Sequence, residues 1–338
     1  MTDRNRQLLL RERPTGQVGP EHFDLVEAPV PAPGPGEVLL RTRWLSFDPA
    51  QRGRLNDVRS YVPPVALGAT MEADGIGEVV ASNAPDVAVG QLVHAQVGWQ
   101  DYAVVDPATT GLFEPVPADV AEPHHMLGLL GMTGLTAYFG MTYSGGPVEG
   151  DAVLVTAAAG ATGSIAGQIA RILGAAQVVG TAGSDDKRAW VRDVAGFDEC
   201  LDHYADDILR QIRGANRDGY QVVFDNVGGE LLDAALFNIA ERSRVVLCGS
   251  ISTGYKPQRP DVGLFYYQLL TMRRSRMEGF LVTDYADRFA EARRDLQTWA
   301  DEGRLHQQYD VLDGLEQAPL ALSRLFSGGN LGKQLVRL

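Results

Sequence analysis

The chain has few of the residues that build metal or disulfide frameworks, and it lacks a membrane-type segment. Of its 338 residues only two are cysteines, Cys200 and Cys248, and six are histidines. Structural zinc commonly takes four cysteines, and these histidines do not show the spacing of a three-ligand catalytic site. We therefore expect no metal and no structural disulfide. No run of about 18 apolar residues is present and no signal-type core follows the first residues, so we expect a cytoplasmic protein.

Positive charge is also scarce. Thirty Lys and Arg stand against 43 Asp and Glu, which gives a net charge of −13. This balance argues against nucleic acid and against an anionic membrane as partners. The content of 45% hydrophobic and 22% charged residues is typical of a globular protein, and the length suits two domains.

The most informative segment is a glycine-containing turn between a predicted strand and a predicted helix. The apolar run 151–156 is typical of a buried parallel strand, and 164–173 shows helical spacing. Between them, Ala157–Gly163 places Gly160 where a phosphate can approach the backbone and Gly163 where a helix can pack closely on a strand. N–H groups at a helix start favour a pyrophosphate, so the turn predicts dinucleotide binding. A flavodoxin-like turn without this cofactor is the alternative.

The end of the next strand decides between NAD and NADP. An NAD site has an acidic residue there, about 20 residues after the turn. Here Gly183 and Ser184 follow the predicted strand 176–181, and Lys187 comes just inside the next helix. The small residue leaves room for a 2′-phosphate, which a hydroxyl and a cation can bind. We therefore predict NADP, the alternative being that Ser184 only caps the helix and that Lys187 is solvated.

Strand-rich segments flank a region in which strands and helices alternate. In the first 125 residues we predict strands at 37–44, 75–82, 92–97 and 101–105, and a helix from Pro123 to about Gly131. The alternating region has strands predicted at 152–156, 176–181, 221–225 and 243–248, and helices at 164–173, 185–195 and 230–240. This rhythm predicts a parallel sheet with right-handed crossovers. The tail 305–338 returns to short strands.

Six motifs carry a resemblance over nearly the whole chain, and they lie at 127–140, 157–163, 183–187, 224–230, 248–252 and 330–333. Together they resemble the zinc-independent medium-chain dehydrogenase/reductases. Within that branch they are most similar to the alkenal/one oxidoreductase and prostaglandin reductase group, also called leukotriene B4 dehydrogenase-like. The resemblance implies an α/β fold in which a doubly wound Rossmann nucleotide domain (126–304) is inserted into a strand-rich GroES-like substrate domain (1–125 plus 305–338).

The resemblance also implies NADP (NADPH) as the cofactor. Lys187 and Tyr204 resemble residues that bind the 2′-phosphate, and Asn330 resembles an asparagine that reaches the cofactor from the tail. For Asn226 an Asx turn remains an alternative, and for Asn330 a plain turn residue does. The complete set expected at the cofactor is Ala159, Gly160, Ala161, Thr162, Gly163, Gly183, Ser184, Lys187, Tyr204, Asn226, Gly249, Ser250, Ile251, Ser252, Phe280, Val282 and Asn330.

The activity implied is NADPH-dependent reduction of the carbon–carbon double bond of an α,β-unsaturated ketone or aldehyde. Hydride addition at the β-carbon moves charge onto an enolate oxygen, which hydrogen-bond donors can stabilise without a metal. The candidate catalytic residues are Arg52, Tyr267 and Tyr255, which lies one residue beyond the family's tyrosine position at Gly254. Each tyrosine could instead be a half-buried aromatic. A quinone reductase, a ketone/alcohol oxidoreductase of the same superfamily and a non-enzymatic NADPH-binding protein remain alternatives.

One further run bears on assembly. Residues Met277–Val282 predict the last strand of the nucleotide domain, with an open edge. The resemblance implies that two subunits pair along this edge into a homodimer. The expected partners are therefore a second copy and a small-molecule enone or enal.

Overall fold

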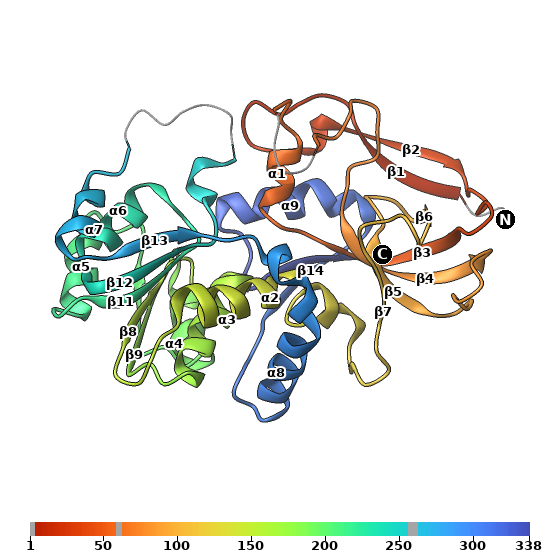
Figure 1. Ribbon diagram of the computed structural model, residues 1–338. Helices are drawn as coiled ribbons and strands as arrows, with labels where there is room; N and C mark the ends of the chain where they lie inside the picture. Colours follow the sequence, from red (N-terminus) through yellow and green to blue (C-terminus); the bar gives the residue numbers. More distant parts are fainter. Residues whose placement is uncertain (1–3, 59–62, 256–262) are drawn as a thin grey trace.

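The computed structural model describes residues 4–58, 63–255 and 263–338, which fold around two main β-sheets lying side by side (Figure 1). The first sheet contains six parallel strands in the order β10-β9-β8-β11-β12-β13. In chain order this is 3-2-1-4-5-6, the doubly wound Rossmann arrangement. The strands are β8 (Ala152–Val155), β9 (Gln177–Ala182), β10 (Glu199–Asp202), β11 (Tyr220–Asp225), β12 (Ile239–Leu247) and β13 (Arg276–Gly279).

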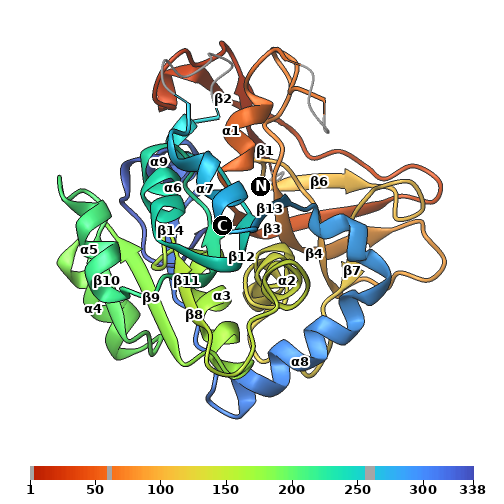
Figure 2. The same cartoon turned by 60° about the vertical axis from the view of Figure 1, so that its left-hand side comes forward.

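Helices cover both faces of this sheet because successive strand side chains point to opposite sides. Val153 and Val155 pack in one hydrophobic cluster with α2, α3, α4 and α8, whereas Leu154 packs in another with α5 and α6. Figure 2 shows α2, α3 and α8 close together, to the right of β8 and β9. The helices are α2 (Met132–Phe139), α3 (Ala161–Ile172), α4 (Asp185–Asp193), α5 (Ile208–Ala215), α6 (Gly229–Phe237), α7 (Leu269–Met272) and α8 (Phe289–Asp301).

The second sheet belongs to the GroES-like domain, named the substrate domain after its expected role, and joins the two ends of the chain. Its order is β14-β15-β3-β4-β5-β7, and β6 pairs with β3. Its members are β3 (Val38–Ser46), β4 (Asp74–Ser82), β5 (Leu92–Gln96), β6 (Tyr102–Val105), β7 (Phe113–Pro115), β14 (Tyr309–Asp313) and β15 (Lys333–Arg337). The strands β1 (Arg4–Leu10) and β2 (Phe23–Pro29) form a separate antiparallel ribbon, and the helices of this domain are α1 (Ala50–Arg54) and α9 (Ala318–Ser327). The expected GroES-like plus Rossmann fold is thus confirmed.

Three local predictions are wrong. The helix predicted from Pro123 to Gly131 is a 3₁₀ turn over Pro123–Leu127, and the α-helix begins only at Met132. Here the chain doubles back so tightly that a Cβ at Gly131 would lie 2.1 Å from the Met126 carbonyl oxygen. The tail contains α9 besides strands, and β13 ends at Gly279, so that Val282 begins a 3₁₀ helix instead of closing the strand.

Candidate functional site

The glycine turn lies at the carboxyl end of β8, at the point where the strand order reverses. It passes through Ala157, whose φ is +50°, and Gly160 then forms the N-cap of α3. A Cβ at Gly163 would lie 2.5 Å from the Ala157 carbonyl oxygen, so only glycine lets this helix pack so closely. Among the described residues, a Cβ on Gly160 would have one close neighbour, the Ala157 carbonyl oxygen at 3.1 Å. The first helical N–H groups, those of residues 161–163, have no acceptor within the helix and suit a phosphate.

A second group of hydrogen-bonded residues lies at the carboxyl ends of β8 and of the neighbouring strand β11. The Thr156 hydroxyl donates to Asp225 Oδ1 at 2.7 Å, and Asn226 Nδ2 donates to the Thr156 carbonyl oxygen at 2.7 Å. Asp225 is fully buried, and this burial raises the pKa of its carboxyl group. Thr156 and Asp225 hold Asn226 in place, and the sequence reasoning did not single them out. Their signal was a polar residue at the end of each of two buried strands.

The segment after β12 packs on this turn. The Ile251 N–H donates to the Asn226 carbonyl oxygen at 3.3 Å, and Ser252 Oγ donates to the Val227 carbonyl oxygen at 2.6 Å. The Ser250 hydroxyl lies beside Gly228, where a Cβ would be 2.9 Å away. Residues 249–252 and Asn226 therefore form one continuous wall beyond the carboxyl ends of β11 and β12.

The corner after β9 brings together the residues predicted for the 2′-phosphate. Ser184 caps α4 by accepting from the Lys187 N–H at 3.4 Å, and Lys187 Nζ donates to the Gly328 carbonyl oxygen at 2.9 Å. Burial lowers the pKa of Lys187. The Tyr204 ring is 70% exposed and lies over Gly183, where a Cβ would meet it at 2.6 Å. Ser184 thus has the capping role that the sequence left open, and Gly328 is a contact that the sequence did not reveal.

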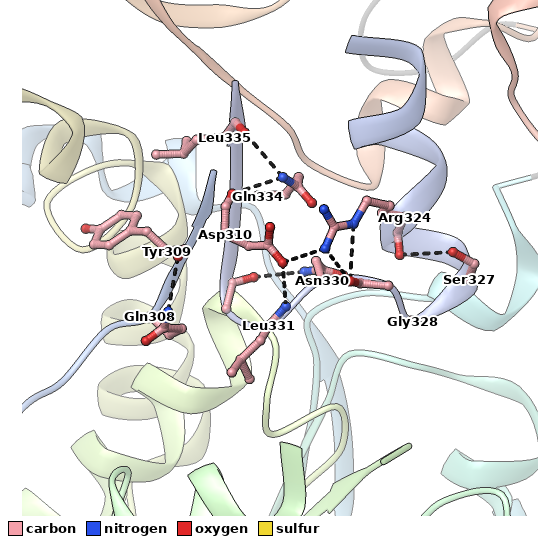
Figure 3. Close-up of polar contacts among 12 residues, drawn as sticks. Gln308, Tyr309, Asp310, Arg324, Ser327, Gly328, Asn330, Leu331, Gln334 and Leu335 are labelled. Carbon is pink, nitrogen blue, oxygen red and sulfur yellow. Dashed lines mark hydrogen bonds and ion pairs between the residues drawn. The ribbon is translucent and has the colours of Figure 1, made fainter. Parts of the chain in front are cut away.

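A loop from the tail, 328–332, contacts both parts of this site. Figure 3 shows Gly328, Asn330 and Leu331 of this loop beside Asp310 and Arg324. Asp310 Oδ2 holds it by accepting from Arg324 Nη2 at 2.7 Å and from the Leu331 N–H at 3.2 Å. The Gly332 N–H donates to the Ala159 carbonyl oxygen at 2.9 Å, beside a bridge between Gly332 and Gly160. Asn330 Nδ2 donates to the Gly332 carbonyl oxygen at 2.9 Å, so its amide closes its own turn.

The three catalytic candidates lie in different surroundings. The Tyr255 hydroxyl points to the end of β12, 3.6 Å from the position of a Cβ on Gly249, and therefore faces the wall at Asn226. Tyr267 is 61% exposed and lies in the 3₁₀ turn Tyr266–Gln268, just before α7. Arg52 is only 2% exposed and donates to Asn56 Oδ1 at 2.7 Å and to the Pro14 carbonyl oxygen at 2.8 Å. Its guanidinium thus serves contacts inside the substrate domain.

Phe280 and Val282 follow the edge strand and turn toward the core. The Phe280 ring lies against Gly140, where a Cβ would be 2.6 Å from it, and both side chains pack on the main hydrophobic cluster. Both side chains are only partly buried, so the two residues remain next to the carboxyl end of β13.

The turn 157–163, the corner 183–187 and the segment 249–252 are together called the cofactor cradle. This cradle fits NADP. The open turn at Gly160 and the free helix start suit a pyrophosphate, and no carboxylate follows β9 where a ribose 2′-hydroxyl would need one. Lys187 and Tyr204 flank the same corner. In the part of the chain that the structure describes, no three His, Cys, Asp or Glu side chains gather where they could hold a metal ion. None of the helices among the described residues is long and apolar enough to cross a bilayer.

Comparison with known proteins gives matches along the whole chain. Residues 6–112 match a family described as the N-terminal domain of oxidoreductases, and residues 161–298 match one described as zinc-binding dehydrogenase. The chain is 39% identical to the NADPH-dependent curcumin reductase of Escherichia coli, covering 99% of this chain and 97% of that one. It is 36% identical to a 2-alkenal reductase (NADP⁺-dependent) of Nicotiana tabacum, covering 98% and 97%.

Solved structures agree with this result. The crystal structure of CurA from Vibrio vulnificus in complex with NADPH superposes with a TM-score of 0.92. It is 38% identical in sequence, and the match covers 98% of each chain. The fold described above is therefore that of a protein whose structure has been solved with NADPH bound.

Proposed function

Since the chain belongs to the medium-chain dehydrogenase/reductase superfamily and is an NADP-dependent oxidoreductase of the alkenal/one reductase group, we propose that it reduces the carbon–carbon double bond of α,β-unsaturated ketones or aldehydes. The observation that supports this most directly is the position of the Tyr255 hydroxyl. It faces the ends of β11 and β12, where a doubly wound sheet binds its ligand. A hydroxyl there can donate to a substrate carbonyl beside the cofactor.

Different residues in and beside the cradle would bind different parts of the cofactor. Lys187 and Tyr204 would hold the 2′-phosphate, and the N–H groups at the start of α3 would hold the pyrophosphate. Asn226 and the segment 249–252 would line the nicotinamide end. When bound, NADPH supplies the hydride that the β-carbon of the substrate accepts. Backbone groups of Phe280 and Val282 adjoin the same end of the sheet.

Tyr255 would supply the stabilisation of charge. As the β-carbon takes up hydride, negative charge develops on the carbonyl oxygen, and a hydroxyl that already points there needs no rearrangement. The α-carbon then takes up a proton, which completes the saturated ketone or aldehyde. One positioned donor of this kind is worth about 2.7–4 kcal/mol, or about 10²–10³ in kcat.

The test combines a substrate panel with two matched tyrosine variants. Oxidation of NADPH should be fast with enones and enals and slow with quinones, and NADP⁺ should not oxidise secondary alcohols at a comparable rate. Tyr255→Phe should lower kcat by about 10²-fold and leave the Kd for NADPH unchanged, because only the donor is lost. Tyr267→Phe is the matched control. If Tyr267→Phe loses activity while Tyr255→Phe turns over at the parent rate, the donor is Tyr267.

We also propose that two subunits pair through β13 into a homodimer. This strand is the last in its sheet, and Leu281, just beyond its end, is 48% exposed. An unpaired sheet edge of this kind favours association with another strand. Light scattering at micromolar concentration should therefore return a dimer mass. Leu281→Arg should shift it toward the monomer, whereas Leu25→Arg, at a position 51% exposed on β2, should not; a monomer mass for the parent protein would refute the pairing.

A further inference from the structure

Tyr255 has a backbone conformation that residues with large side chains rarely adopt. It follows the 3₁₀ turn Ile251–Thr253, and both Gly254 and Tyr255 are left-handed, with φ of +61° and +50°. For a residue with a bulky side chain this region is costly and persists only where the surroundings hold it. Within the turn, the Tyr255 N–H donates to Thr253 Oγ1 at 3.2 Å. The Tyr255 carbonyl group is held from the other domain.

The residue that binds the Tyr255 carbonyl group is Asn56, which follows α1 in the substrate domain. Asn56 is only 7% exposed, and its Nδ2 donates to the Tyr255 carbonyl oxygen. Its Oδ1 accepts from Arg52 Nη1 at 2.7 Å. A guanidinium group has donors only, so Arg52 requires the amide oxygen on its side and thereby turns the amide nitrogen toward Tyr255. The amide therefore has one orientation that satisfies both neighbours.

Arg52 is itself anchored. Its Nη2 donates to the carbonyl oxygens of Pro14 at 2.8 Å and Gly16 at 3.4 Å. The result is a continuous chain of hydrogen bonds from the N-terminal segment through Arg52 and Asn56 to the backbone of Tyr255. This chain of hydrogen bonds crosses from the substrate domain to the Rossmann domain between Asn56 and Tyr255, which are 199 residues apart in sequence.

We infer that Asn56 is a positioning residue for the reduction. It holds the Tyr255 backbone from across the domain junction, so that the Tyr255 hydroxyl stays aimed at the substrate carbonyl. Arg52 acts through Asn56 by fixing its amide. This inference rests on the proposed function, because it gives Asn56 a role only through Tyr255. The Tyr255 ring also meets the Phe326 ring of α9 edge-on at 6.4 Å, so side chain and backbone are both held by the substrate domain.

The test uses Asn56→Asp in the full-length enzyme with NADPH and an enone. The carboxylate keeps an acceptor for Arg52 but has no N–H for the Tyr255 carbonyl group, so the two contacts are separated. We expect kcat to fall about 10- to 100-fold, the scale for a displacement of about 1 Å at a catalytic group, with an unchanged Kd for NADPH. In the Tyr255→Phe background the same substitution should cost less than about twofold, because the group it positions is already gone. Asn238→Asp is the matched control, since Asn238 is equally buried and donates to the Ala234 carbonyl oxygen at 2.9 Å.

Hydrogen exchange of the segment 249–255 in the free enzyme gives a readout without turnover. It should be faster in Asn56→Asp than in the parent protein and unchanged in Asn238→Asp. Parent-like kcat and exchange in Asn56→Asp would overturn the inference, as would a loss of kcat that persists in full in the Tyr255→Phe background. If Tyr255→Phe keeps the parent rate, the donor role in the proposed function fails, while faster exchange in Asn56→Asp would still support the hold on the backbone.

Discussion

Lys187→Ala should change the choice between NADPH and NADH more than any other single substitution at the cradle. The ammonium group has three donors, so it can keep its bond to Gly328, at 2.9 Å, and still reach a phosphate. A hydrogen bond to a charged group is worth about 1.5–3 kcal/mol. Its loss corresponds to a roughly 10- to 150-fold higher Kd for NADPH. The Kd for NADH should be nearly unchanged, because NADH has no 2′-phosphate.

The assay is a fluorescence titration of both cofactors at two ionic strengths and over a pH series. Since Lys187 is half-buried, salt should weaken NADPH binding only partly, and the salt effect should shrink in the variant. The charged ammonium binds the phosphate, and burial lowers the pKa of Lys187, so the preference for NADPH should be present at neutral pH and decline as the pH rises through that pKa. Arg192→Ala removes the same charge from the last turn of α4 and is the control. Equal losses for NADPH and NADH in Lys187→Ala would refute the assignment.

Two further predictions concern the turn and the domain junction. Gly160→Val should weaken NADPH and NADH alike by more than about tenfold (~1.4 kcal/mol), because the pyrophosphate is common to both, and unaltered affinity in the same titration would place the phosphates elsewhere. At the junction, His94, with Nδ1 3.8 Å away, and Arg293, which donates at 2.7 Å, lower the pKa of Glu114 to about 2. The stability that Glu114 contributes is therefore complete above the ordinary carboxyl pKa of about 4.3 and is lost as the pH falls toward 2. The difference in unfolding free energy between the parent and Glu114→Gln should shrink over that range, and a constant difference would contradict the role of the charge.

The Rossmann half was predictable because its signals are local. Buried parallel strands such as β8 read as continuous apolar runs, and Gly160 and Gly163 mark the turn that follows. The ribbon of β1 and β2 was missed because polar residues interrupt the apolar pattern of both strands and because they pair with each other outside the main sheets. The helix α9 was missed because its apolar positions were taken for strands of the tail.

The site was predictable only where a residue lies in a motif. Lys187 follows Ser184 by three residues and could be inferred, but its acceptor Gly328 lies 141 residues away. Asn56 gives no signal of its own, because its partner is a backbone carbonyl group in another domain. Arg52 resembles a family arginine, but the sequence did not reveal its burial or its hydrogen bond to Asn56.

The insertion of one domain into the other gives the tail a function in both. Within six residues, Gly328 accepts from Lys187 at the corner proposed for the 2′-phosphate, Gly332 pairs with Gly160 at the turn proposed for the pyrophosphate, and Lys333 contacts the segment before α1. Lys333 is 1% exposed, and its Nζ donates to Asp48 Oδ1 at 2.6 Å, just before α1. The same short segment therefore sets the distance between the cofactor cradle and the helix that precedes Asn56. A change in the loop 328–332 should therefore disturb the contacts at Lys187 and at Gly160 together, because one short segment makes both.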